Sequence, residues 1–182
     1  MTLTDHHIEE LLQLCKTGHQ SAQLEVYNRY YKAMYNTALR ITKNTAEAED
    51  VMQESFLSAF TKLDSYKGDS TFGSWLKRIV VNNSLNSYQK KNRMGEVPLE
   101  NDLYWLSDND NPEDCNSNTS EVKRVLRTIA TLKDNYRVSL TLHLIEGYDY
   151  EEVSDIMKIS YANCRTMVSR AKESLRKKLV ES

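Results

Sequence analysis

Residues 65–93 read Ser65-Tyr-Lys-Gly-Asp-Ser-Thr-Phe-Gly-Ser-Trp-Leu-Lys-Arg-Ile-Val-Val-Asn-Asn-Ser-Leu-Asn-Ser-Tyr-Gln-Lys-Lys-Asn-Arg93. The first part, Lys67 to Ser70, has the composition of a turn, in which glycine supplies backbone freedom. Ser70 or Thr71 can then cap a helix, because a side-chain oxygen accepts a hydrogen bond from an otherwise unpaired N–H group. Apolar residues follow at i, i+3, i+4, i+7 and i+8, which predicts one buried helical face made of Phe72, Trp75, Leu76, Ile79 and Val80.

The same predicted helix becomes polar and basic beyond Val80. Residues 62–95 carry seven Lys and Arg residues against two Asp residues, a net charge of +5 in a chain whose net charge is −2. Bases of a single nucleic-acid strand stack on aromatic rings and its phosphates pair with Lys and Arg, so this composition suits such a strand. The alternative is an amphipathic core helix with a solvated basic end, and this stretch alone favours the alternative.

The composition of the whole chain predicts a helical protein. Its 182 residues allow one domain or two small ones, and they include only five Gly and two Pro residues. No apolar run approaches the roughly 18–20 residues of a membrane span, and the N-terminus lacks the pattern of an export signal. The three cysteines, Cys15, Cys115 and Cys164, are widely spaced, which is typical of reduced thiols. We therefore expect a cytoplasmic protein with neither disulfides nor a metal site.

Charge and proline divide the chain into three parts. Residues 96–119 contain seven acidic residues and no basic one, and residues 94–119 hold both prolines without a helical or strand period. This composition predicts an acidic, flexible linker. We expect an all-α fold with two small helical domains, residues 1–93 and 120–182, on either side of the linker at 94–119. Basic regions in both domains suggest two contacts with a polyanion.

Two helices are predicted before residue 44. The first is capped by Thr4 or Asp5 and ends at Gly18, and the second runs from about Ser21 to about Ile41. Several tyrosines on the second helix combine a large apolar body with a polar end, which suits a core that is also an interface.

The predicted helix at residues 45–63 has two distinct faces. Asn44 or Thr45 caps it, and its inward positions are Val51, Met52, Ser55, Phe56, Ala59, Phe60 and Leu63. The opposite face carries acidic and amide groups with one exposed leucine, at Asp50, Gln53, Glu54 and Leu57. We call these four residues the docking strip. An ordinary solvated face is the commoner explanation of such a pattern, and the functional one is a docking surface for a basic partner.

The C-terminal part predicts a helix-turn-helix. Apolar periods indicate helices at about residues 120–132 and 136–145, the second ending at Gly147. A short helix then carries Val153, Ile156 and Met157, a turn follows at residues 158–160, and Ser160 caps a longer helix. Lys158 occupies the turn position that often holds glycine. A left-handed backbone there would cost a lysine about 1 kcal/mol.

The longer helix has a polar stripe opposite its core. Arginine can bind guanine in a bidentate manner in the major groove, and small hydroxyl residues let the backbone approach, so the stripe suits DNA recognition. The residues are Ala162, Arg165, Thr166, Ser169, Arg170 and Glu173. Further positive charge for phosphates is supplied by Lys172, Arg176, Lys177 and Lys178. A basic C-terminal helix in an ordinary helical protein is the alternative.

Two functional classes can be compared with these features, and both fit the sequence poorly. A stand-alone helix-turn-helix regulator would have no use for the docking strip or the basic aromatic helix. An enzyme, such as a hydrolase using Asp50 and Glu54, would need an accompanying phosphate loop, paired histidine ligands or a nucleophile arrangement, which the sequence lacks. His6 and His7 lie at the N-terminus, where solvent exposure is expected. No catalytic residue, cofactor or small-molecule substrate is therefore predicted.

Three motifs in this order and spacing resemble the extracytoplasmic-function sigma factors, the smallest group of the sigma-70 family of bacterial transcription initiation factors. The resemblance covers about residues 20–93 and 120–179. The motifs are Asp50-x-x-Gln53-Glu54-x-Phe56, Lys67-Gly-Asp-Ser-Thr-Phe72-x-x-Trp75-Leu-x-Arg78-Ile-x-x-Asn82, and Gly147-Tyr-x-Tyr-x-Glu-Val153 followed by Arg165-Thr-x-Val-Ser-Arg170-Ala-Lys.

This resemblance implies that the N-terminal domain serves core binding and the −10 element. The docking strip would contact the clamp helices of the β′ subunit of core RNA polymerase. The loop from Tyr66 to Phe72, with Lys67, Gly68, Asp69, Ser70 and Thr71, would capture a flipped base of the non-template strand. Melted strand and upstream backbone would be held by Arg78, Asn82, Lys90, Lys91 and Arg93.

The resemblance also assigns the remaining parts. Ala162, Arg165, Thr166, Ser169, Arg170 and Lys172 would bind the −35 element of promoter DNA. The β flap of the polymerase and an anti-sigma factor, which can hold such proteins at the membrane, are the other implied partners, and the acidic linker would follow the RNA path. Met167, Lys172 and Asn163-Cys164 depart from the family's pattern, so its usual −35 preference does not carry over.

Overall fold

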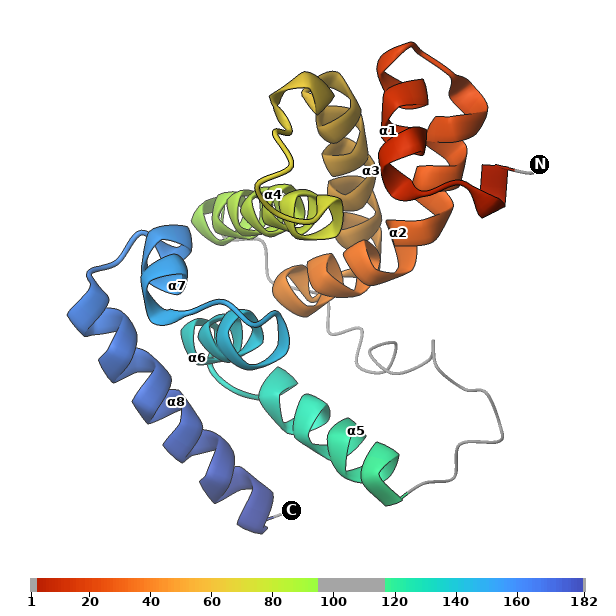
Figure 1. Cartoon of the computed structure of the whole chain (residues 1–182). Coiled ribbons are helices and arrows are strands. Elements are labelled where there is room, and N and C mark those ends of the chain that lie inside the picture. The colour runs from red at the N-terminus through yellow and green to blue at the C-terminus, as the bar shows by residue number, and fades with distance from the viewer. Residues whose placement is uncertain (1–2, 95–116, 182) are drawn as a thin grey trace. The chain divides into compact units, whose positions relative to one another are not determined.

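The computed structural model describes residues 3–94 and 117–181, and every regular element within these ranges is helical, so the predicted all-α class is confirmed. The helices form two compact units, α1–α4 and α5–α8 (Figure 1). The first unit contains η1 (Leu3–Asp5), α1 (Ile8–Lys16), α2 (Gln20–Thr42), α3 (Thr45–Thr61), η2 (Leu63–Ser65) and α4 (Phe72–Met94). The second contains α5 (Ser117–Ala130), α6 (Asp134–Leu140), a single π turn (Thr141–Ile145), α7 (Tyr150–Met157) and α8 (Tyr161–Glu181).

In the first unit, α2, α3 and α4 pack against one another and α1 packs on α2. Apolar residues from all three long helices meet in the core, where each buried Val, Leu or Phe contributes about 1.5–3 kcal/mol. They include Met34, Ala38, Ile41, Val51, Met52, Phe56, Phe72, Leu76 and Val80. The predicted inward face of α3 is buried apart from Phe60, which is half-buried.

Side-chain caps fix where two of these helices begin. The Asn44 side chain accepts a hydrogen bond of 2.9 Å from the Glu47 N–H at the start of α3. The Thr71 hydroxyl accepts one of 3.2 Å from the Ser74 N–H at the start of α4. Of the two cap candidates that the sequence offered at each helix, these contacts select Asn44 and Thr71.

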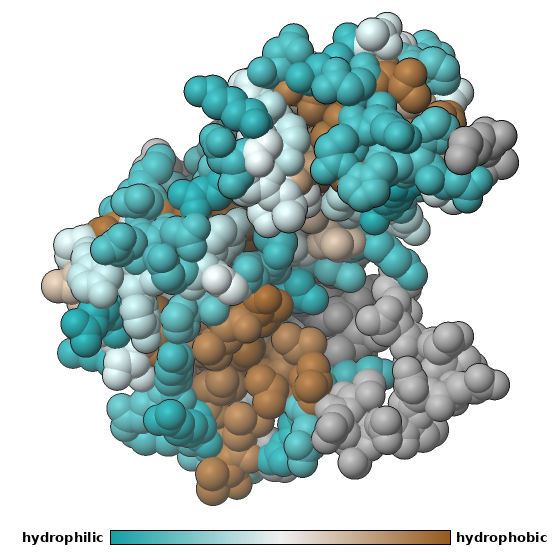
Figure 2. Space-filling view, viewed as in Figure 1, coloured by the Kyte–Doolittle hydropathy of each residue, from teal (hydrophilic) through white to brown (hydrophobic). Residues whose placement is uncertain are grey.

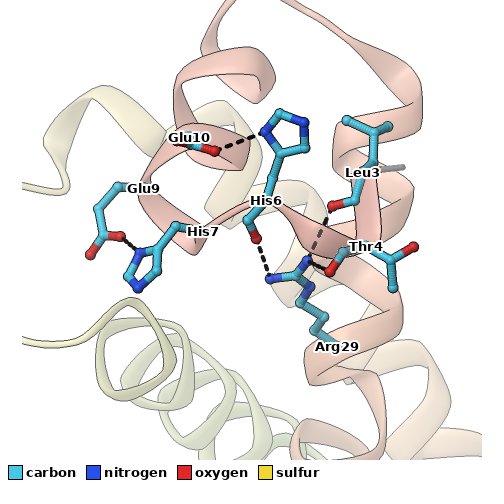
Figure 3. A network of polar contacts seen from close by, with 7 residues as sticks. All are labelled: Leu3, Thr4, His6, His7, Glu9, Glu10 and Arg29. Carbon is cyan, nitrogen blue, oxygen red and sulfur yellow. Dashed lines mark hydrogen bonds and ion pairs between the residues drawn. The ribbon is translucent and has the colours of Figure 1, made fainter. Parts of the chain in front are cut away.

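The predicted cap of the first helix is wrong. Thr4 and Asp5 belong to a separate 3-10 turn, and His7 precedes α1 without a side-chain cap. Arg29 of α2 explains the difference, because its guanidinium donates to the carbonyl oxygens of Leu3, Thr4 and His6 at 3.2, 2.9 and 3.0 Å (Figure 3). Its Nε also pairs with Glu25 at 2.7 Å. The backbone before α1 is therefore held on α2 by one arginine.

In the second unit, α5, α6 and α7 each pack on α8. Six consecutive residues, from Arg137 to Leu142, are buried, so the end of α6 is enclosed on all sides. The sequence predicted one helix over 136–145, whereas the structure interrupts it with the π turn, and Leu144 there is exposed. Among the described residues, no helix has the length and apolarity of a membrane span.

Candidate nucleic-acid interface

The docking strip lies on the exposed face of α3. Asp50, Gln53, Glu54 and Leu57 are all exposed, and 69% of the Leu57 surface is accessible. The opposite face of the same helix is buried against α2 and α4. A large aliphatic side chain that is exposed beside two carboxylates and an amide is suited to a partner that is both basic and apolar.

The loop from Tyr66 to Thr71 connects η2 to α4. The side chains of Lys67, Asp69, Ser70 and Thr71 are exposed. Gly68 has a φ of +81°, a conformation that residues with a Cβ adopt at a cost. The Tyr66 hydroxyl donates a hydrogen bond of 2.7 Å to the Ser70 carbonyl oxygen. This bond joins the first residue of the loop to a residue near its end.

The first residue of this loop, Tyr66, belongs to a cluster of aromatic rings. The Tyr66 ring centroid lies 5.7 Å from that of Phe72 and 5.4 Å from that of Trp75. Tyr30 of α2 joins them, with its ring 5.4 Å from Phe72. A Cβ at Gly73 would lie 3.0 Å from the Tyr30 ring, so glycine permits this close approach. Burial raises the pKa of the Tyr30 phenol.

Beyond the loop, α4 presents a polar face. Asn82, Asn86 and Lys90 follow one another at intervals of four and are exposed, whereas Arg78 is half-buried. Lys91 and Arg93 belong to α4. Their side chains, which were predicted to contact DNA, lie outside the described part of the structure. The described residues therefore give a row of two amides and one lysine along α4, beginning ten residues after Phe72.

Two polar contacts between α3 and α4 were missed by the sequence analysis. The Asn83 amide donates to the Ser55 hydroxyl at 3.0 Å, and the Ser87 hydroxyl donates to the Glu47 carboxylate at 2.6 Å. Glu47 is buried, which its place in the first turn of α3 does not reveal from the sequence. Asn83 and Ser87 are one turn apart, so both contacts hold the same side of α4 against α3.

In the second unit, α7 and α8 form the predicted helix-turn-helix. Asp149 and Glu152 make a capping box at the start of α7. Lys158 ends α7 with a φ of +55°. This is the left-handed backbone whose cost for a lysine was considered from the sequence. The Ser160 hydroxyl accepts a hydrogen bond of 3.3 Å from the Asn163 N–H and caps α8, as predicted.

The proposed base-reading face of α8 is open to solvent. Ala162, Arg165, Thr166, Ser169 and Arg170 are exposed, and Lys172 is half-buried. The Arg165 guanidinium carbon lies 6.0 Å from the centre of the Tyr161 ring, at the outer limit of a cation–π contact. The opposite stripe is buried through Cys164, Val168, Ala171 and Leu175. The helix therefore separates its core face from a polar face that carries two exposed arginine side chains.

Two of the predicted phosphate-contacting lysines have partners within the second unit. The Lys178 ammonium donates to the carbonyl and hydroxyl oxygens of Thr131 at 2.9 and 3.1 Å. The Lys177 ammonium pairs with Glu173 at 3.0 Å, and this hydrogen bond lowers the pKa of the Glu173 carboxyl. Arg176 is exposed and is better placed to meet a phosphate.

An apolar surface lies between α5 and the C-terminal half of α8. Figure 2 shows it as a brown area in the lower part of the view. Val122 and Val180 are 57% and 87% exposed, and Val125, Leu126 and Leu179 are half-buried. An arginine, Arg124, hydrogen-bonds to the Leu179 carbonyl oxygen and ties the two helices together. Contiguous apolar surfaces of this kind are typical of binding sites for other proteins.

The described residues contain no group of three or more metal-ligating side chains. Cys15 and Cys164 are buried free thiols, and burial raises the pKa of Cys15 to about 11 and also raises that of Cys164. A thiol with a raised pKa is a poor nucleophile at neutral pH. Cys115 lies outside the described residues.

Family models and curated relatives match both units. A model described as Sigma-70 region 2 matches residues 26–94, and one described as Sigma-70, region 4 matches residues 123–175. The ECF RNA polymerase sigma-E factor of Salmonella typhimurium is 31% identical over 185 residues, covering 97% of this chain and 95% of the relative. The RNA polymerase sigma-H factor of Pseudomonas aeruginosa is 28% identical, covering 97% of this chain and 96% of its own.

Solved structures show the same fold. CnrH, in complex with the cytosolic domain of CnrY, matches with a TM-score of 0.56 and 22% identity over 94% of this chain and 96% of that one. The sigma factor RpoE of Bartonella quintana, in complex with the anti-sigma factor NepR, matches with a TM-score of 0.57 and 21% identity over 85% of this chain and 94% of that one.

Proposed function

The chain belongs to the extracytoplasmic-function group of RNA polymerase sigma factors, and on this premise we propose a role for each of its exposed surfaces. A stand-alone helix-turn-helix regulator is not favoured, because the curated relatives match both units over nearly the full length. The proposal assigns core binding and the −10 element to the first unit and the −35 element to the second. These roles are proposed for domains at residues 1–93 and 120–182, on either side of a linker at 94–119.

The docking strip is assigned to the clamp helices of the polymerase β′ subunit. The observation that carries this role is the exposure of Leu57 within an acidic and amide row that makes no contribution to the core. An aliphatic anchor surrounded by charged groups gives both apolar burial and electrostatic selection of a basic partner.

Charge reversal in the strip tests this assignment. We expect Glu54→Lys to raise the Kd for core polymerase by at least about tenfold, because it places a cation against a basic surface. Glu9→Lys makes the same charge change at an exposed position of another helix of this unit, α1, and should leave the Kd unchanged. Fluorescence anisotropy of the labelled chain titrated with core measures both, and circular dichroism checks that the helices persist. Equal weakening by both variants would contradict a local docking strip.

The loop and the polar face of α4 are assigned to the −10 element. Exposed loop residues Lys67 to Thr71 offer backbone and side-chain groups to an unstacked base. The row Asn82, Asn86 and Lys90 then offers amides and positive charge to the strand that leaves the loop. Extracting a base costs a few kcal/mol, so groups that hold it once it is unstacked help to open the duplex.

The polar face of α8 is assigned to the major groove of the −35 element. Arg165 and Arg170 are exposed on it, with Thr166 and Ser169 between them and Ala162 three residues before Arg165. Arginine provides bidentate hydrogen bonds to guanine, and each good pair gives about 1–3 kcal/mol of discrimination. Lys172 and Arg176 are assigned to phosphates.

The apolar surface between α5 and α8 is assigned to protein partners, with the β flap of the polymerase as the partner in the holoenzyme. The relatives CnrH and RpoE of Bartonella quintana were solved with CnrY and NepR respectively. By analogy, an anti-sigma factor is proposed to hold this chain inactive and, where that regulator is membrane-bound, to keep it at the membrane. Promoter DNA, core polymerase and this regulator are then its partners.

A further inference from the structure

We propose that the Tyr66 hydroxyl positions the base-capturing loop by closing it on itself, so that Tyr66 acts through the loop and not as a surface on which a base stacks. The proposal concerns the loop from Tyr66 to Thr71 and rests on the function assigned to that loop above. It changes the role of Tyr66 from a DNA contact to a positioning residue. Lys67, Gly68, Asp69 and Ser70 are then the residues whose placement it controls.

The Tyr66 ring is already engaged within the protein. Phe72 meets it edge-on, with the ring planes at 81° and the centroids 5.7 Å apart. Trp75 also contacts this ring, with the centroids 5.4 Å apart and the planes at 47°. Phe72 and Trp75 contact each other, and Tyr30 of α2 packs against Phe72. The ring therefore forms part of the apolar support of α4, and its half-buried state follows from that packing.

The two ends of the loop are held by other contacts. At its start, the Tyr66 N–H donates to the Leu63 carbonyl oxygen at 3.1 Å, and Leu63 is buried. At its end, the Thr71 hydroxyl caps α4 through the Ser74 N–H. The segment that remains without such support is Lys67 to Ser70, whose residues are all exposed.

The Tyr66 hydroxyl supplies the link across this unsupported segment. Within residues 3–94, no backbone–backbone hydrogen bond outside the helices involves residues 67–70. The bond of 2.7 Å from the Tyr66 hydroxyl to the Ser70 carbonyl oxygen spans it instead. The left-handed Gly68 lies at the bend between these two residues. One phenol thus selects a loop shape from those that an exposed, glycine-containing segment could adopt, which lowers the entropy lost when a base binds.

Removal of the Tyr66 hydroxyl oxygen distinguishes a positioning role of Tyr66 from a role in base stacking. Tyr66→Phe keeps the ring, its packing on Phe72 and Trp75, and any surface for a base, and it deletes only the donor to Ser70. Tyr30→Phe is the matched control, because it removes a hydroxyl from the same aromatic cluster without removing a hydrogen bond to the loop. Thermal unfolding of both variants checks that the aromatic cluster remains intact.

The assay measures binding of holoenzyme to single-stranded DNA. Core polymerase is reconstituted with each variant, and the probe is a fluorescein-labelled non-template strand covering the −10 element of a promoter that this holoenzyme transcribes. Copies with one abasic site at each position locate the captured base. For the wild-type chain, one abasic position should weaken binding strongly. For Tyr66→Phe, we expect the intact strand to bind about two- to tenfold more weakly, the loss that one hydrogen bond accounts for.

The pattern across probes decides the outcome. The proposal requires that Tyr66→Phe weakens the intact strand and leaves the strand with the decisive abasic site unchanged, while Tyr30→Phe behaves as the wild type. Wild-type affinity of Tyr66→Phe for every probe would overturn the positioning role, because the ring alone would then suffice. An equal loss on intact and abasic strands would also overturn it, because the effect would not pass through the base. A wild-type holoenzyme indifferent to all abasic sites would instead overturn base capture by the loop.

Discussion

Two lysines adopt the left-handed conformation at the ends of helices. Lys43 closes α2 with a φ of +59°, and Lys158 closes α7 with a φ of +55°. A side chain with a Cβ crowds the following carbonyl group in this region, whereas glycine does not. At Lys158 the strain lies within the turn that sets the angle between α7 and α8, so this turn conformation is adopted at a cost in stability.

Relief of this strain should stabilise the second unit. We expect Lys158→Gly to raise the free energy of unfolding by about 0.5–1 kcal/mol, although glycine also increases the entropy of the unfolded chain. Lys158→Ala removes the same charge and keeps the Cβ, so it should give no such gain. Urea denaturation followed by circular dichroism compares the three proteins. A gain in Lys158→Ala equal to that in Lys158→Gly would assign the effect to charge and contradict backbone strain.

At the scale of secondary-structure elements, α4 is fixed against α3 by polar as well as apolar contacts. The pair Ser55–Asn83 and the pair Glu47–Ser87 lie on the side of α4 that faces α3. Asn82 and Asn86, their direct neighbours in sequence, are exposed. The rotation of α4 about its axis is therefore set by the same stretch that carries the amides proposed to meet the DNA strand.

The Glu47–Ser87 contact gives a stability prediction. Ser87→Ala should lower the free energy of unfolding of the first unit by about 1–3 kcal/mol, because it removes a donor to a buried carboxylate. Asn86→Ala changes an exposed polar residue of the same helix and should stay within about 0.5 kcal/mol of the wild type. Chemical denaturation measures both. If the two substitutions cost the same, the contact does not stabilise the packing of α4 on α3.

The polar face of α8 predicts a difference between base and phosphate contacts. Arg165→Ala should lower binding most at promoters whose −35 element carries the matching base, by about 1–3 kcal/mol. Arg176→Ala should weaken binding uniformly and reduce the salt slope by about one unit, because it removes one phosphate contact. Arg176 suits this comparison better than its neighbour Lys177, because Lys177 pairs with Glu173. Holoenzyme affinities for a panel of −35 variants at several salt concentrations distinguish the two. Identical losses at every promoter would contradict base reading by Arg165.

Helical periodicity correctly predicted the helices that carry one apolar face. The structure differs from the predictions where contacts between residues distant in sequence determine the local structure. The buried and exposed faces of α3 and α8 follow directly from spacing in the sequence. The predicted cap at Thr4 or Asp5 failed because Arg29, more than twenty residues away, binds the carbonyl oxygens of Leu3, Thr4 and His6. The burial of Glu47 and the loop-closing bond of Tyr66 also depend on tertiary partners. Local propensity carries no signal for such contacts.

At the scale of the whole molecule, charge alternates along the chain in a way that suits one partner complex. Residues 62–95 have a net charge of +5 and residues 120–182 one of +3, with seven acidic residues in 96–119 between them. On the proposed roles, the two positive regions would attract promoter DNA, whereas the docking strip would offer acidic groups to core polymerase. A chain with a net charge of −2 should therefore bind DNA weakly alone and specifically within the holoenzyme.

Promoter-specific run-off transcription tests this account most directly. Purified core polymerase is combined with the wild-type chain or with Glu54→Lys on a set of linear promoter templates, and the transcripts are sized. We predict that the wild-type chain directs initiation from a defined start on a subset of templates, and that Glu54→Lys reduces this product in proportion to its loss of core binding. Absence of a defined product with the wild-type chain, together with no binding to core, would contradict the assignment.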